Sequence, residues 1–173
     1  MNKLNKILLT TDGADGAGVE VDPLSQASSG IEAPKFPCLA PDRICRFTIK
    51  KCSHGPTKDN PNRNSLTIVL NTVKDYNDTD GKVLRAGFTG YKRIGTTVIT
   101  AEEAGEKRPR DINAIKADLA MVLKACGMGE KSPRDLLNNP SIVEGQVVDM
   151  KVGLQKERDG YPASNSFTFV LPA

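Results

Sequence analysis

Long apolar runs are missing from this 173-residue sequence, as is tryptophan. The longest apolar stretches are short pieces such as 7–9 and 119–123, whereas a membrane-spanning helix needs about 20 apolar residues. The N-terminal stretch carries lysines but only a three-residue apolar run, too short for the core of a signal peptide. We therefore expect a cytoplasmic protein with no membrane segment.

Cysteine and histidine are also scarce and poorly arranged for metal binding. The four cysteines, Cys38, Cys45, Cys52 and Cys126, form no closely spaced pair, and His54 is the only histidine. Structural zinc sites use clustered Cys and His at short spacing. Without an export signal, cysteines are expected to stay reduced. We expect free thiols, no metal site and no cofactor.

Catalytic motifs are missing too. The sequence contains neither a phosphate-binding P-loop nor a Gly-x-Ser-x-Gly elbow. His54 lies in a loop rich in Pro and Asn without an obvious nucleophile, and the expected strands carry almost no carboxylate besides Asp149. We predict that the protein is not an enzyme, and a small metal-dependent nuclease stays as a rival hypothesis.

What the sequence does have is an uneven distribution of charge. The formal net charge is +3, but residues 43–93 hold eleven basic and four acidic residues, which gives +7. Residues 1–42 sum to −3 and residues 94–173 to −1. A basic third of the chain favours an anionic partner. The alternative is a solvated basic surface without a ligand.

Composition divides the chain into a leader and one domain. Residues 10–35 are rich in Gly, Ser, Ala, Pro and Asp without apolar periodicity, which predicts a flexible leader over residues 1–40. Periodic patterns begin at Cys45 and continue to the C-terminus, with no internal repeat. Residues 41–173 are therefore predicted to form a single domain.

Apolar residues at every second position predict five strands in that domain. These lie near 45–50, 65–73, 82–95, 143–157 and 166–171. In the third, Leu84, Ala86 and Phe88 are expected on one face. Between the third and fourth strands, apolar residues at helical spacing predict a helix over 109–126, with Asp111 at its start, and a short second helix after Ser132 and Pro133.

This order predicts a mainly β fold: a five-stranded antiparallel OB-fold-like barrel with a helical insert between strands 3 and 4. Another α+β sheet is the alternative. Phe47, Phe88, Phe167 and Phe169 fall on the apolar phase of their strands, so we assign them to the core.

An OB-fold binds oligonucleotides on its second and third strands and on the loops after strands one and four. Cations on these segments would contact phosphates, and exposed tyrosines would stack on bases. The predicted DNA-binding residues are Lys50, Lys51, Lys58, Arg63, Arg85, Tyr91, Lys92, Arg93, Lys156, Arg158 and Tyr161. Tyr76 is a weaker stacking candidate, and ordinary half-buried tyrosines are the alternative reading for Tyr91 and Tyr161.

The spacing of Arg43–Ser53 and Ser65–Val73, the helix ending LKACGM and the run DLLNNPSIVEGQVVDMKVGLQKE resemble the OB-fold single-stranded DNA-binding proteins of bacteriophages. The resemblance covers about three quarters of the chain. It implies a protein that coats single-stranded DNA during replication or recombination in the host-cell cytoplasm, with replication or recombination proteins as further partners. Many single-strand binders form oligomers. Many also end in an acidic tail, but this chain ends TFVLPA.

A rival hypothesis from another class is a structural or protein-interaction β-domain, such as a virion or assembly component, that binds no nucleic acid. The sequence does not separate DNA from RNA as the ligand.

Overall fold

The computed structural model describes residues 37–105, 109–157 and 162–172. Most of the predicted leader, together with Arg158 and Tyr161, lies outside the described residues. The folded unit spans Pro34–Ala173, so residues 37–40, which the sequence assigned to the leader, belong to it. Leu39 is fully buried and bridges Asp78. No helix in the described part of the chain is long and apolar enough to cross a membrane.

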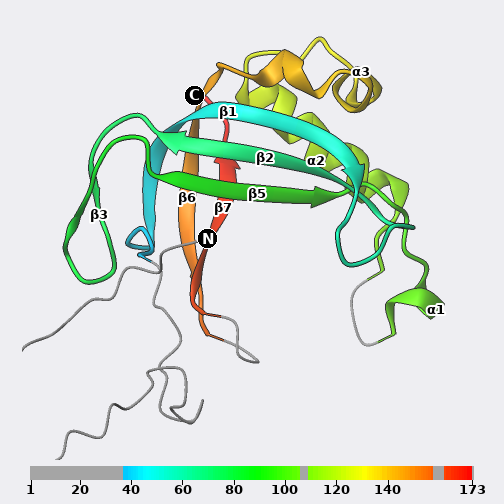
Figure 1. Ribbon diagram of the computed structural model, residues 1–173. Helices are drawn as coiled ribbons and strands as arrows, with labels where there is room; N and C mark the ends of the chain where they lie inside the picture. Colours follow the sequence, from blue (N-terminus) through cyan, green and yellow to red (C-terminus); the bar gives the residue numbers. More distant parts are fainter. Residues whose placement is uncertain (1–36, 106–108, 158–161, 173) are drawn as a thin grey trace, which may run out of the picture. The chain divides into compact units, whose positions relative to one another are not determined.

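Five strands form one antiparallel sheet, as predicted (Figure 1). They are β1 (Arg43–Pro56), β2 (Asn64–Thr72), β5 (Thr89–Gly95), β6 (Val147–Gln155) and β7 (Ser164–Val170), in the order β5-β2-β1-β6-β7. The long strand β1 joins the two halves, because its first part pairs with β6 and its later part pairs with β2. It is longer than the sequence suggested, since it continues through the predicted loop to Pro56.

The sheet is not closed into a barrel by hydrogen bonds. β5 and β7 are its two edge strands, and no ladder joins them within the described residues. The edges nevertheless meet through side chains, because the ring of Phe167 lies directly against Gly90. The predicted five-stranded antiparallel sheet is thus confirmed, whereas a hydrogen-bonded closure is not seen.

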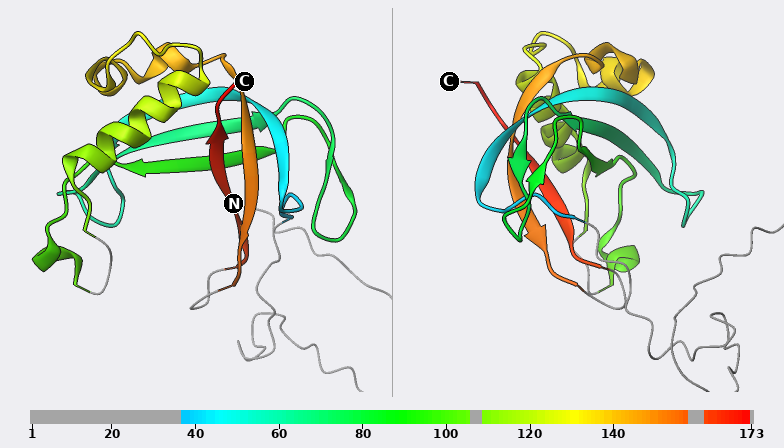
Figure 2. Two further views of the ribbon diagram at one scale, coloured as in Figure 1. Left: turned by 180° about the vertical axis from the view of Figure 1, so that it is seen from behind. Right: turned by 60° about the vertical axis from the view of Figure 1, so that its left-hand side comes forward.

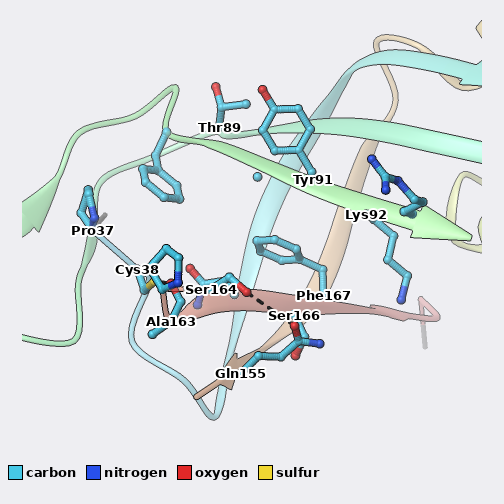
Figure 3. A pocket seen from close by; sticks show the side chains of 15 residues that line it. Pro37, Cys38, Thr89, Tyr91, Lys92, Gln155, Ala163, Ser164, Ser166 and Phe167 are labelled. Carbon is cyan, nitrogen blue, oxygen red and sulfur yellow. Dashed lines mark hydrogen bonds between the residues drawn. The ribbon is translucent and has the colours of Figure 1, made fainter. Parts of the chain in front are cut away.

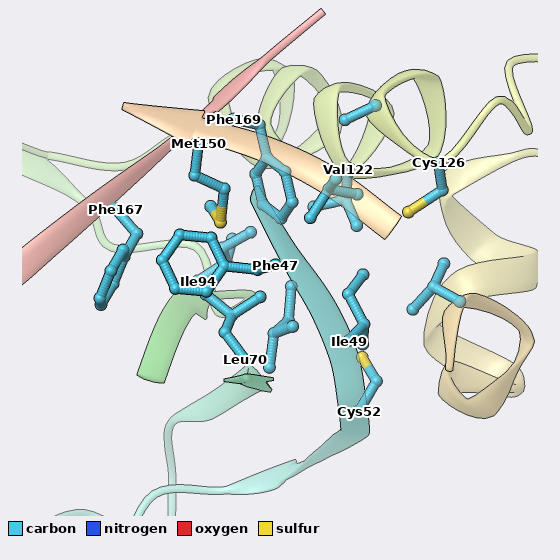
Figure 4. Packing of buried hydrophobic residues seen from close by; sticks show 14 of the residues in the cluster. Phe47, Ile49, Cys52, Leu70, Ile94, Val122, Cys126, Met150, Phe167 and Phe169 are labelled. Carbon is cyan, nitrogen blue, oxygen red and sulfur yellow. The ribbon is translucent and has the colours of Figure 1, made fainter. Parts of the chain in front are cut away.

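The inward face of the sheet forms the core with helix α2 (Ile112–Ala125) (Figure 4). Phe47, Ile49 and Leu70 from β1 and β2 are fully buried, and Phe47 meets Phe167 edge-on with ring centroids 5.4 Å apart. Phe169 is buried as well, so three of the four phenylalanines assigned to the core are there. The fourth, Phe88, is only partly buried against it.

The helical insert follows its predicted signals. Asp111 caps α2 by accepting a hydrogen bond from the Ala114 N–H, and Ser132 caps α3 (Pro133–Asn138) in a reciprocal box with Asp135. A short helix α1 (Ala101–Ala104) precedes α2, and a 3-10 turn η3 (Pro140–Val143) leads into β6. Seen from behind, α2 runs across the sheet (Figure 2). Ile112, the first residue of α2, is 51% exposed.

The predicted third strand is wrong in its first half. Residues 82–95 do not form one strand: β4 (Val83–Leu84) pairs with β3 (Tyr76–Asn77) in a separate hairpin, and the chain turns before β5 begins. Asp75 causes this turn, because its carboxylate accepts hydrogen bonds from the Arg85 side chain and the Ala86 N–H. Gly87, with φ of +89°, completes it. Leu84, Ala86 and Phe88 therefore share no strand face.

Candidate nucleic-acid interface

Three adjacent strands of the sheet contain no carboxylate. β1, β2 and β5 together carry six basic residues and no Asp or Glu. The basic residues are Arg43, Arg46, Lys50 and Lys51 on β1 and Lys92 and Arg93 on β5. Because these strands are hydrogen-bonded neighbours in the order β5-β2-β1, those of the cations that point outward lie on one continuous surface.

We call the outward side of β1, β2 and β5 the outer basic face. The register aligns two rows of residues on it. Lys51 pairs with Val69, which pairs with Tyr91, and Ser53 pairs with Thr67, which pairs with Arg93. Neighbouring strands are about 4.8 Å apart, so each row is about 10 Å wide. Tyr91 is 66% exposed at the centre of the edge strand. An exposed ring thus stands across the sheet from a lysine and two residues from an arginine.

A β-bulge in β1 adds a second lysine. The pairing of β1 with β2 shifts register between Ile49 and Lys51. Ile49 and Cys52 are both buried, so the two residues between them, Lys50 and Lys51, are both exposed. An ideal strand would turn one of two consecutive side chains into the core. The bulge instead leaves two adjacent cations exposed at the middle of the sheet.

Most of these cations have no carboxylate partner among the described residues. The ion pairs there are Arg46–Asp149 (2.8 Å), Arg85–Asp75 (3.1 Å) and Arg110–Asp118. Lys50, Lys51, Lys92 and Arg93 take part in none of them. Arg85, predicted to lie on the third strand, is corrected by the structure: it follows β4 in the turn and is paired with Asp75.

Three further predicted cations in the described residues lie outside the strands of this face. Lys58 is exposed and Arg63 half-buried in the loop between β1 and β2, and Arg63 lies close enough to Glu103 to help lower the pKa of that carboxyl. Lys156 is exposed just after β6. Arg158 and Tyr161 belong to the undescribed part of the same β6–β7 loop, so their predicted role stays a prediction.

Tyr76 is held by structural contacts, unlike Tyr91. Its hydroxyl accepts a hydrogen bond from the Arg46 N–H at 2.7 Å, and the Lys74 ammonium lies 5.5 Å from its ring centroid. These contacts tie the β3–β4 hairpin to β1. Of the two tyrosines in the described residues considered for stacking, only Tyr91 therefore lies on the face of the main sheet.

A groove lies where the two edge strands approach one another (Figure 3). We call it the seam groove; its volume is about 840 Å³. Phe88, Tyr91 and Lys92 line it from the β5 side, and Gln155 and Phe167 from the β6–β7 side. The groove could not be predicted from the sequence, because residues far apart in the chain meet there only after folding.

The displaced pKa values elsewhere have structural causes. Hydrogen bonds from Thr100 lower the pKa of Glu103, those from Ser132 lower that of Asp135, and the Arg46 guanidinium lowers that of Asp149. Burial raises the pKa of Cys52 to about 12 and that of Cys126 to about 11. These groups cap helices, join strands or fill the core.

His54, the only histidine, is also engaged in the fold. Its Nε2 lies 2.9 Å from the Thr96 hydroxyl in a half-buried position, linking β1 to the segment after β5.

Comparison of the chain with protein families and with curated proteins gives no match. The candidate interface therefore stands on the geometry of its own residues.

Proposed function

We propose that this protein binds single-stranded DNA in a sequence-tolerant manner, as a non-enzymatic component of phage replication or recombination. One observation carries the proposal. Three neighbouring strands present cations without any carboxylate, and an exposed tyrosine stands among them. Single-strand binding needs cations to follow the phosphates and flat rings to stack on the bases.

We further propose that the domain is a partly open OB-fold barrel. The strand order and the helix between β5 and β6 support this assignment, as does the approach of the two edge strands at Gly90 and Phe167. In an OB-fold the ligand lies on the second and third strands of the barrel and on two flanking loops. The corresponding segments here are β2, β5 and the loops after β1 and β6. Of the predicted cations in the described residues, these segments carry Lys58, Arg63, Lys92, Arg93 and Lys156, whereas Lys50 and Lys51 lie on β1 beside β2.

In this proposal the strand of DNA crosses β1, β2 and β5 on their outer face. Lys50, Lys51 and Arg93 contact successive phosphates, and the ring of Tyr91 stacks on a base. Such contacts read no base edge, so the binding tolerates any sequence. Release of counterions from the phosphates makes the affinity depend on salt.

The test compares a thymidine oligomer of about 30 nucleotides, enough for several sites, with a duplex of the same length by fluorescence anisotropy. The proposal expects tight binding of the single strand and much weaker binding of the duplex. Equal binding of both, or binding of neither, would overturn it. A matching uridine oligomer tells whether DNA is preferred over RNA.

The second candidate function is a protein-interaction or assembly domain. It is favoured by the unpaired edges of β5 and β7 in the described residues, since free strand edges can pair with another chain. This candidate predicts no affinity for nucleic acid and a defined oligomer in light scattering. Failure of the oligonucleotide experiment together with such an oligomer would favour it.

A further inference from the structure

The seam groove has the chemistry of a ligand site rather than of a packing defect. Its volume of about 840 Å³ falls in the range of small-molecule pockets, about 300–1,000 Å³. The lining includes three aromatic rings, those of Phe88, Tyr91 and Phe167. Among the described residues it also includes Lys92 and Arg93 and no carboxylate. A ligand that suits this lining is flat and carries negative charge.

The floor of the groove is built around Gly90. A Cβ at this position would lie 2.6 Å from Cζ of Phe167, so only glycine admits the ring. Phe167 is held from its other side by Phe47. These contacts join the two edges without a ladder hydrogen bond. The edges cannot separate to admit a whole peptide strand without losing them, which argues against strand addition as the use of the groove.

The groove is continuous with the outer basic face at Tyr91. Tyr91 and Lys92 extend from opposite sides of β5, Tyr91 toward the outer face and Lys92 toward β7, as Figure 3 shows. Both line the groove. A nucleic-acid strand on the outer face can therefore pass over the edge of β5 while still in contact with a ring and a cation.

We infer that the seam groove receives one unstacked base of the bound strand, with Tyr91 and Phe167 beside the base and Lys92 near its phosphate. This inference rests on the proposed function and adds a site to it. The outer basic face alone would bind DNA through its phosphates and through stacking on the surface. The groove adds a contact that forms only when the DNA strand carries a base.

The test uses amide chemical shifts of the ¹⁵N-labelled protein with two probes of about 8 nucleotides, a length within one site. One probe is a thymidine oligomer, and the other is an abasic oligomer with the same phosphates. We expect the amides of Gly90, Ser164 and Phe167, which line the groove, to shift with the thymidine oligomer only. The amides of Lys51 and Val69 on the outer face respond to both probes.

A pair of variants tests the site by filling it. Ser164→Phe places a ring at a groove-lining position of β7, and Thr168→Phe places the same ring on the same strand away from the groove. Loss of a stacked base is worth about 1–3 kcal/mol, so we expect Ser164→Phe to weaken binding of the thymidine oligomer about tenfold. Thr168→Phe is expected to bind like the unmodified protein.

The outcomes separate the two proposals. If the oligomer binds but the groove amides stay unmoved, or move equally with the abasic probe, the groove inference is wrong and the proposed function stands. Unchanged affinity of Ser164→Phe for the oligomer also overturns the groove inference. If the unmodified protein binds no oligomer, the proposed function fails, and the inference fails with it.

Discussion

At the scale of single residues, two neighbouring residues of β5 point to different sides of the strand. Tyr91 is exposed on the outer face, whereas Lys92 is half-buried and extends toward β7. The alternation of a strand accounts for the difference, because successive side chains point to opposite faces. An inward lysine is tolerated here because β5 is an edge strand bordered by the seam groove, so its ammonium group keeps access to solvent.

Replacing the exposed ring tests its role directly. We expect Tyr91→Ala to reduce affinity for single-stranded DNA about tenfold, because stacking contributes about 1–3 kcal/mol per base. The thermal stability of Tyr91→Ala is expected to stay near that of the unmodified protein, since the Tyr91 side chain is largely exposed. Tyr76→Phe is the control. It removes the hydrogen bond from the Arg46 N–H, which lowers stability by about 1 kcal/mol, and leaves affinity unchanged. An affinity loss confined to Tyr76→Phe would contradict the assignment.

A second prediction concerns the glycine under Phe167. Gly90→Ala places a methyl group within 2.6 Å of a buried ring, and such overpacking costs about 1–3 kcal/mol. Gly95→Ala, on the same strand, meets its nearest atom only at 3.8 Å, so its stability is expected to change by less than about 0.5 kcal/mol. Chemical denaturation measures both. Equal stabilities of the two variants would show that Gly90 is not the point where the edges meet.

At the scale of elements, short-range signals predicted well and long-range contacts did not. The caps Asp111 and Ser132 mark the helix starts seen in the structure, because capping depends on residues within one turn. The alternation of Cys45, Phe47 and Ile49 gave β1 for the same reason. The start of the third strand was misplaced, since Asp75, ten residues earlier than Arg85, turns the chain there. The bulge leaves a signal that the prediction did not use, because Lys50 and Lys51 are two consecutive polar residues between Ile49 and Cys52.

The ion pair between β1 and β6 predicts a dependence of stability on pH. Arg46 holds the pKa of Asp149 below its ordinary value of 3.8. A lowered folded-state pKa stabilises the protein above the unfolded value, and that stability is lost as pH falls through the folded value. The difference in unfolding free energy between the unmodified protein and Asp149→Asn should therefore shrink from about pH 7 to about pH 3. A difference that is constant with pH would contradict this account. Asp59→Asn, in an exposed loop, serves as the control.

At the scale of the whole molecule, the sequence located the basic strands but not the surface that they form. Charge counting identified residues 43–93, and β1, β2 and β5 all lie within that range or begin there. The groove had no signal in the sequence, because the segments around residues 88–93 and 162–167 meet across the two edges only in the folded sheet. Arg85 shows the opposite failure, since a correct count of charge did not reveal its pairing with Asp75.

The central claim is that phosphates bind to the outer basic face, and its most direct test is the salt dependence of single-strand affinity. Lys50, Lys51 and Arg93 are three cations of this face that form no ion pair among the described residues. If each neutralises one phosphate, the slope of log affinity against log salt is about −2 for a single strand. Lys51→Ala should weaken this slope by about 0.7, and Lys116→Ala, exposed on α2, should leave it unchanged. Anisotropy with a thymidine oligomer measures all three proteins. A slope near zero, or equal losses in the two variants, would contradict the account.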